Sequence, residues 1–137
     1  RRQVWAAGGI GITPFRSFLQ SPIPPDYQVD LFYAYANAAD GAYADELKML
    51  ERPENLRIHL IDSSTAGFLK IEDITRCVGD VPFDLFFCGP APMRKYLQAG
   101  LVRTQCALGT FHYEKFQFKG TGVFSLLQRF FPRRASA

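Results

Sequence analysis

The chain has 137 residues, of which 47% are hydrophobic and 21% charged, so it suits one domain with its own core and is too apolar to be disordered as a whole. The longest stretch without a charge, residues 3–15, falls short of the roughly 20 apolar residues of a membrane span. Three cysteines without a CxxC pair predict neither a disulfide framework nor a zinc site, and a reducing cytosolic setting is expected. Because the chain begins with Arg1 and not with Met, we expect it to be a piece of a longer protein.

The net charge of +3 is concentrated at the end of the chain. Residues 115–137 hold five basic and no acidic residues, whereas residues 1–114 hold 11 basic against 13 acidic residues. The body therefore lacks the charge of a nucleic-acid-binding surface, and no nucleic-acid partner is expected. Residues 120–137 also carry an apolar stripe, so the sequence predicts a domain over residues 1–119 and a basic apolar tail over residues 120–137.

The first predicted strand, residues 3–7, leads into a glycine-rich turn and a short helix at residues 15–19. The turn reads Gly8-Gly9-Ile10-Gly11-Ile12-Thr13-Pro14. Glycines permit a sharp turn and let the backbone approach a ligand closely. Thr13 is predicted to cap the helix and Pro14 to take its first position, where free N–H groups suit a phosphate. The third glycine of the G-x-G-x-x-G fingerprint is missing, so a tight turn with nothing bound stays an alternative.

Apolar runs of strand length then alternate with helical segments. Further strands are expected over residues 29–35, 56–61, 83–88 and 110–118, and helices over 43–50, 71–78 and 93–101. This alternation predicts an α/β fold, a Rossmann-like three-layer sandwich with helices on both faces of a five-stranded parallel sheet. In the common strand order 3-2-1-4-5, the first and fourth strands are neighbours, and the turns that follow them line one crevice.

The fourth and fifth strands carry the other two motifs. The fourth ends in Cys88-Gly89-Pro90-Ala91-Pro92-Met93, where a lone cysteine is usually a small apolar residue and has no nearby histidine base, so a hydrolase is disfavoured. The fifth contains Phe111-His112-Tyr113-Glu114-Lys115-Phe116. Glu114 is either exposed at the strand edge or placed at a site, and His112 shares its strand face. Trp5 is expected to pack in the core or at the sheet edge, and His59 is expected to be structural.

Taken together and in this order, the three motifs resemble the nicotinamide-nucleotide-binding domain of the ferredoxin–NADP reductase superfamily, over residues 4–118. Residues 30–50, 86–97 and 111–119 most resemble bacterial ferric-reductase-like membrane flavoproteins, which are related to the NADPH oxidases. The resemblance implies an oxidoreductase module that delivers hydride from NAD(P)H to FAD held by a preceding domain. It also implies a transmembrane haem domain in the same polypeptide, a place at the cytoplasmic face of a membrane, and ferric or other transmembrane electron transfer.

The resemblance implies site residues position by position. Cys88 would lie beside the nicotinamide C4, Glu114 near the site of hydride transfer, and Phe116 over the flavin ring until nicotinamide displaces it. No metal site is implied. The residues implied to bind the dinucleotide are Gly8, Gly9, Gly11, Thr13, Pro14, Tyr35, Asn37, Ser63, Ser64, Gly89, Pro90 and Met93.

The chain departs from the family's pattern at two places. NADPH-specific members often carry arginines after the second and third strands, but here these places read Tyr35-Ala36-Asn37 and Asp62-Ser63-Ser64-Thr65. Because a guanidinium fork is what grips a 2′-phosphate, we expect NADH to bind at least as well as NADPH. The flavin-binding Arg-x-Tyr-Ser-like motif is also missing, so the isolated domain is expected neither to retain FAD nor to show much activity.

Two other functions stay open. The chain is alternatively the module of a soluble ferredoxin or oxygenase reductase, although it contains no iron–sulfur cysteine spacing. It is otherwise a non-catalytic module for nucleotide binding or interaction, against which the retention of Cys88, Glu114 and Phe116 speaks. The basic apolar tail is expected to contact either a membrane surface or the protein's own domains.

Overall fold

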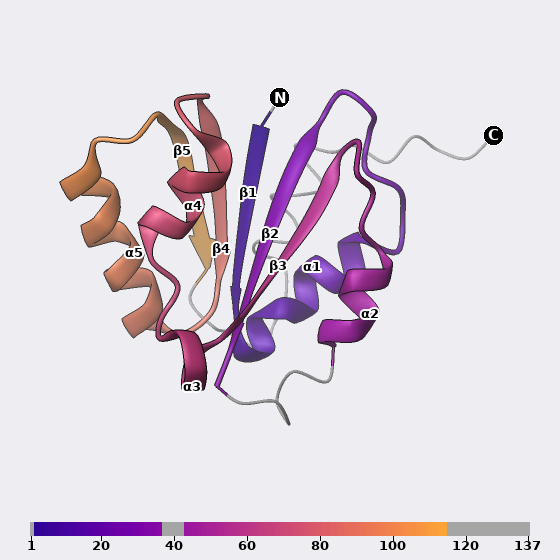
Figure 1. Cartoon of the computed structure of the whole chain (residues 1–137), viewed down its shortest axis with the longest axis horizontal. Coiled ribbons are helices and arrows are strands. Elements are labelled where there is room, and N and C mark those ends of the chain that lie inside the picture. The colour runs from indigo at the N-terminus through magenta and orange to yellow at the C-terminus, as the bar shows by residue number, and fades with distance from the viewer. Residues whose placement is uncertain (1, 37–42, 115–137) are drawn as a thin grey trace.

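The computed structural model describes residues 2–36 and 43–114, and their centre is a five-stranded sheet (Figure 1). The strands lie in the order β3-β2-β1-β4-β5, and every neighbouring pair is parallel. This confirms the predicted fold class and strand order. The strands are β1 (Arg2–Gly8), β2 (Gln28–Tyr35), β3 (Leu56–Asp62), β4 (Phe83–Cys88) and β5 (Leu108–Glu114).

Helices cover both faces of the sheet and form the outer layers of the sandwich. Figure 1 shows α1 and α2 on one face and α4 and α5 on the other, while the short α3 follows β3 at the carboxyl edge of the sheet. Their bounds are η1 (Gly9–Gly11), α1 (Ile12–Phe18), α2 (Ala44–Met49), α3 (Ser63–Ala66), α4 (Ile71–Val78) and α5 (Ala91–Thr104). None of the described helices is long and apolar enough to cross a membrane.

The central strand β1 is buried on both faces, which explains the apolar run of residues 4–7 within it. Trp5 points toward α1, where its ring stacks on Phe15 at 5.4 Å and meets the edge of Phe18 at 5.5 Å. Its neighbours Val4 and Ala6 belong to the second core cluster, under α4 and α5. The expectation that Trp5 is a core residue is therefore confirmed.

Two local predictions differ from the structure. Helix α1 begins at Ile12 after the single 3₁₀ turn η1, so its N-cap is Gly11, which offers no side chain. The predictions that Thr13 caps the helix and that Pro14 takes its first position are therefore wrong. The compact turn of three glycines brings the chain into helical geometry before Thr13 is reached. The sequence also did not predict α3. Of the fifth strand predicted over residues 110–118, the part beyond residue 114 lies outside the described residues.

Candidate functional site

Two turns meet at the carboxyl edge of the sheet, one after β1 and one after β4. The strands are neighbours, with Ala7 opposite Cys88. A side chain at Gly11 would overlap the backbone carbonyl of Cys88, and a Cβ on Gly89 would lie 3.0 Å from the backbone nitrogen of Gly8. The turns therefore pack backbone against backbone, so Gly11 is required by the protein's own fold and a side chain at Gly89 would be crowded.

The remaining glycines of the first turn differ from each other. A Cβ at Gly8 would come within 2.5 Å of the Sδ of Met93 and 2.9 Å of the Cδ of Pro90. Gly9 has a φ of +56°, and nothing lies within 4 Å of the place a Cβ would occupy. Gly9 thus presents an exposed stretch of backbone in a conformation that side chains disfavour. Among the glycines of this turn, Gly9 is the one open to a ligand.

Cys88 ends β4 inside the core layer that faces α1, with only 7% of its surface exposed. The parallel register with β5 places Glu114 directly opposite Cys88. The structure therefore brings together, on adjacent strands, two of the three residues implied to be catalytic. The third, Phe116, lies outside the described residues.

The ends of β2 and β3 form a second part of this edge, with Tyr35 opposite Asp62. Ser63 donates its hydroxyl hydrogen bond to the Tyr35 carbonyl at 3.0 Å. Asp62 caps α3, since its Oδ1 accepts from the Ser64 backbone N–H at 3.0 Å and from the Ser64 hydroxyl at 2.6 Å. Both serines are thus engaged within the protein, and the charged group here is the Asp62 carboxylate. Asn37, also predicted to bind nucleotide, lies outside the described residues.

The other predicted binding residues sit in the first turns of α1 and α5. Thr13 is exposed and Pro14 half-buried at the start of α1. Pro90 is the N-cap of α5 and Met93 is half-buried in its first turn. All four therefore lie at the carboxyl edge, around the junction of the two turns. No group of three or more potential metal ligands occurs among the described residues.

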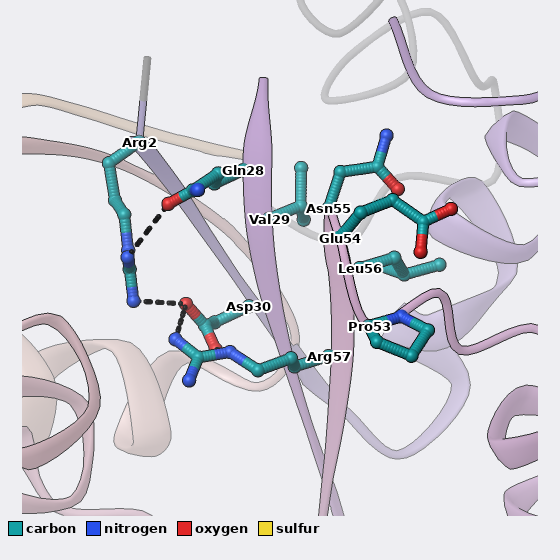
Figure 2. A pocket seen from close by; sticks show the side chains of 9 residues that line it. All are labelled: Arg2, Gln28, Val29, Asp30, Pro53, Glu54, Asn55, Leu56 and Arg57. Atoms are coloured by element: carbon teal, nitrogen blue, oxygen red, sulfur yellow. Dashed lines mark hydrogen bonds and ion pairs between the residues drawn. The ribbon is translucent and has the colours of Figure 1, made fainter. Parts of the chain in front are cut away.

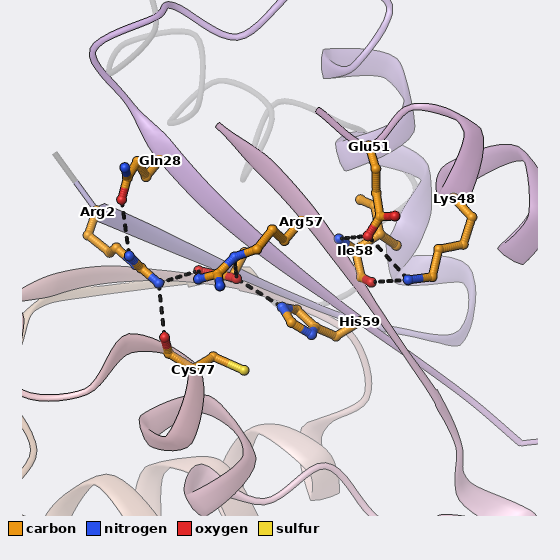
Figure 3. A network of polar contacts seen from close by, with 9 residues as sticks. Arg2, Gln28, Lys48, Glu51, Arg57, Ile58, His59 and Cys77 are labelled. Atoms are coloured by element: carbon orange, nitrogen blue, oxygen red, sulfur yellow. Dashed lines mark hydrogen bonds and ion pairs between the residues drawn. The ribbon is translucent and has the colours of Figure 1, made fainter. Parts of the chain in front are cut away.

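The sequence did not predict the ionic cluster around Asp30. Figure 3 shows its partners Arg2, Arg57 and His59, with Arg2 reaching the carbonyl of Cys77 in α4. Asp30 is 1% exposed and accepts hydrogen bonds from Arg2 at 3.0 Å, Arg57 at 2.9 Å and His59 at 2.8 Å. Arg2 also donates to the carbonyl of Cys77 at 3.0 Å, which ties β1 to α4. His59 is therefore structural, as expected.

Burial by itself raises the pKa of Asp30, but the opposing effects are larger. Hydrogen bonds from His59 and Arg57, together with the charges of Arg57 and Arg2, hold that pKa below its ordinary value. Asp30 thus stays ionised at neutral pH. One signal in the sequence pointed to it, because a carboxylate inside an otherwise apolar parallel strand needs charged partners.

Two cavities of the described part lie along the opposite, amino edge of the sheet. One of about 270 Å³ opens where β1, β2 and β3 begin (Figure 2), and one of about 440 Å³ lies between the segment after α1 and the turn before β3. Both are remote from the predicted dinucleotide site. The first is lined by Arg2, Gln28, Val29, Asp30, Pro53, Glu54, Asn55, Leu56 and Arg57.

A parallel sheet of order 3-2-1-4-5, with glycine turns after its two central strands, defines the dinucleotide-binding class of α/β domains. Residues 6–99 match the family model described as "Oxidoreductase NAD-binding domain", and the chain belongs to this family. A solved structure, full-length CYP116B46 from Tepidiphilus thermophilus, matches 85% of this chain and 15% of its own with a TM-score of 0.55. At 18% identity that match supports the fold alone.

Curated relatives include reductase subunits and flavohemoproteins. The carnitine monooxygenase reductase subunit of Escherichia coli (strain K12) is 31% identical over 85% of this chain and 35% of its own length. The toluene-4-sulfonate monooxygenase system reductase subunit of Comamonas testosteroni is also 31% identical, with the same two coverages. A flavohemoprotein of Bacillus cereus is 24% identical over 82% of this chain and 32% of its own. The chain spans about a third of the length of these relatives.

Proposed function

We propose that this chain is the NAD(P)H-binding module of a flavin-dependent oxidoreductase, which positions NAD(P)H for hydride transfer to FAD held by another domain of the same polypeptide. The observation that carries the proposal is the junction of the two glycine turns. There Gly9 is open to a ligand at the same edge as Cys88 and Glu114. Membership of the oxidoreductase NAD-binding family supports it.

The residues at this edge suit a dinucleotide. The exposed backbone at Gly9 lets a pyrophosphate approach closely, as a Cβ there would not. Bound NAD(P)H supplies the hydride. Cys88 offers a small side chain at the end of β4, beside which a flat ring can lie, and the register places Glu114 opposite it on the next strand. The residues of the chain hold and orient the nucleotide, and they form no covalent bond with it.

The relatives support an oxygenase reductase or a flavohemoprotein-like protein better than the ferric-reductase-like membrane flavoprotein that the motifs resemble. We therefore propose the reductase of an oxygenase-type system as the parent protein. The transmembrane haem domain, the place at the cytoplasmic face of a membrane and the membrane contact of the tail stay predictions. The tail itself lies outside the described residues.

Nucleotide preference follows from the ends of β2 and β3. Asp62 places a carboxylate there, and neither Tyr35-Ala36 nor Asp62-Ser63-Ser64-Thr65 contains a basic residue. A carboxylate repels a 2′-phosphate and accepts hydrogen bonds from a free ribose hydroxyl. We propose that NADH binds at least as well as NADPH.

Titration of the chain with NAD⁺ and NADP⁺, followed by calorimetry and backbone NMR, tests the binding site. We expect saturable binding with the largest shifts at Gly9, Cys88 and Ser63. A clear preference for NADP⁺ would overturn the nucleotide assignment, and absence of binding would overturn the module itself.

Hydride transfer is tested in the parent polypeptide that carries the flavin. Cys88→Ala is expected to slow reduction of FAD by NADH in stopped-flow experiments, with folding and nucleotide binding retained. Nucleotide binding without any flavin reduction in the unmodified protein would favour the non-catalytic module.

A further inference from the structure

We propose that the cavity at the amino edge of the sheet binds a small oxyanion, either free phosphate or the phosphoryl group of a small ester. This cavity of about 270 Å³ opens at the first residues of β1, β2 and β3. Figure 2 shows that the side chains of Arg2 and Arg57 reach toward Asp30 from two sides of the cavity. The proposal stands apart from the proposed nucleotide site, which lies at the other end of the same strands.

The charge balance of the cluster leaves one positive charge in excess. Asp30 is almost completely buried and pairs with two guanidinium groups, Arg2 at 3.0 Å and Arg57 at 2.9 Å. One carboxylate thus serves two cations. Because its other hydrogen-bonding neighbour, His59, adds no negative charge, nothing within the cluster neutralises the second guanidinium. An anion in the cavity would pair with the second guanidinium, in competition with the Glu54 carboxylate on the cavity wall.

The cluster also leaves hydrogen-bond donors toward the cavity. Arg57 uses Nε and Nη2 on the two oxygens of Asp30, and its Nη1 has no partner among the described residues, on a side chain that is 48% exposed. Gln28 accepts from Arg2 through its Oε1, so its amide NH₂ stays a donor at the cavity wall. A guanidinium edge and an amide together match the spaced oxygens of a phosphate.

Arg2 lines the same cavity and contributes its positive charge. Its Nη1 donates to Gln28 and its Nη2 to Asp30 and to the Cys77 carbonyl, whereas its Nε is shielded from solvent and is not reached from the cavity. The donors left for an anion are therefore those of Arg57 and Gln28.

One acidic residue opposes anion binding and provides a test. Glu54 lines the cavity from the turn before β3 and is exposed. Its carboxylate repels an anion in the cavity, so Glu54→Gln is expected to strengthen binding. If the cluster served stability alone, Glu54→Gln would leave anion affinity unchanged.

The experiment titrates the 137-residue chain at pH 7 with sodium phosphate, glycerol 3-phosphate, sodium sulfate and, at matched ionic strength, sodium chloride. Backbone amides and the arginine Nε–H groups are followed by NMR. We expect saturable shifts at Arg57 and Gln28 with the phosphates. Tighter binding of phosphate or of the ester identifies which source of the phosphoryl oxygens the cavity prefers. Shifts no larger than those with chloride would overturn the proposal.

Variants assign the binding to this cavity. Arg57→Gln is expected to weaken phosphate binding at least about tenfold, since a hydrogen-bonded charge is lost. Arg52→Gln is the matched control, because the Arg52 guanidinium donates to the carbonyls of Leu50 and Glu51 and Arg52 is not among the residues that line this cavity. Arg57→Lys keeps the charge and checks for misfolding. Equal affinities in the Arg57→Gln and Arg52→Gln variants would overturn the proposal.

Discussion

The backbone of Gly11 lies against the carbonyl group of Cys88, with no room for a side chain between them. The contact joins the turn after β1 to the turn after β4, and both carry residues proposed to hold the dinucleotide. A glycine in such a turn is easily taken to be required for ligand binding. Here the protein's own packing requires it, whereas Gly9 is the position left open.

Gly11→Ala is expected to lower the free energy of unfolding by about 3 kcal/mol, the upper range for overpacking, because backbone atoms cannot move aside as a side chain can. Urea denaturation measures the loss. The control is Gly9→Ala, which meets no neighbouring atom and costs about 1 kcal/mol for its positive φ. Gly9→Ala should nevertheless weaken nucleotide binding more than its effect on stability suggests. Equal destabilisation by the two variants would contradict this division of roles.

Gly8→Ala is expected to destabilise the protein through the side chain of Met93 and the ring of Pro90. The Met93 sulfur can be removed, so the double variant Gly8→Ala/Met93→Ala should lose about 1 kcal/mol less than the two single variants together. A double-mutant cycle by urea denaturation measures this coupling. If the losses in stability of the two single variants added up to the loss of the double variant, contact with Met93 would not be the reason for glycine at position 8.

Asp30→Asn is expected to cost about 3 kcal/mol of stability, because it leaves two arginines without their shared buried carboxylate. The measurement is the midpoint of urea unfolding at pH 7. Asp80→Asn, an exposed acid after α4, is the matched control and should change stability little. A loss for Asp30→Asn no greater than for the control would contradict the role of the cluster.

The same carboxylate predicts how stability depends on acid. The pKa of Asp30 is lowered in the folded state, so its contribution is present above the ordinary carboxyl pKa of about 4. That contribution is lost as the pH falls from there through the lower folded pKa. Urea unfolding between pH 7 and pH 3 should therefore show a steeper acid loss in the unmodified chain than in Asp30→Asn. If the stability of the two proteins fell in parallel with pH, the lowered pKa of Asp30 would not be a source of acid sensitivity.

Asp62→Asn is expected to raise the affinity for NADP⁺ relative to NAD⁺ by roughly fivefold, the effect of about 1 kcal/mol between charges in water. Asparagine caps a helix as well as aspartate, so α3 should persist. Calorimetric titration with both nucleotides measures the ratio, and Asp45→Asn in α2 serves as the control. An unchanged ratio would place the 2′ end of the nucleotide elsewhere.

The sequence predicted the sheet well because its inner strands β1, β2 and β4 are buried on both faces, and the strands read as apolar runs separated by helices. The strand order and the meeting of the turns after β1 and β4 followed from that alternation. The partition of roles among the glycines could not be predicted, because it depends on which backbone atoms approach within a few ångströms. The first residue of a helix likewise depends on local backbone geometry, and the η1 turn moved the N-cap of α1 from the expected Thr13 to Gly11.

The Asp30 cluster escaped prediction for a different reason. Its members Arg2, Asp30 and Arg57 are each separated by more than 25 residues and meet only through the register of three strands. Composition and periodicity carry no information about register. The candidate site was easier to predict, since consecutive residues of each turn lie at one edge of the sheet.

The position of β1 between β2 and β4 has a consequence for the order in which the protein opens. All of its seven residues pair with β2, and its middle also pairs with β4, so its amides should be among the slowest to exchange with deuterium. Strands β3 and β5, at the ends of the sheet order, should exchange sooner. The glycine turn would then stay attached to the last strand to open, while Glu114 belongs to a strand that opens early.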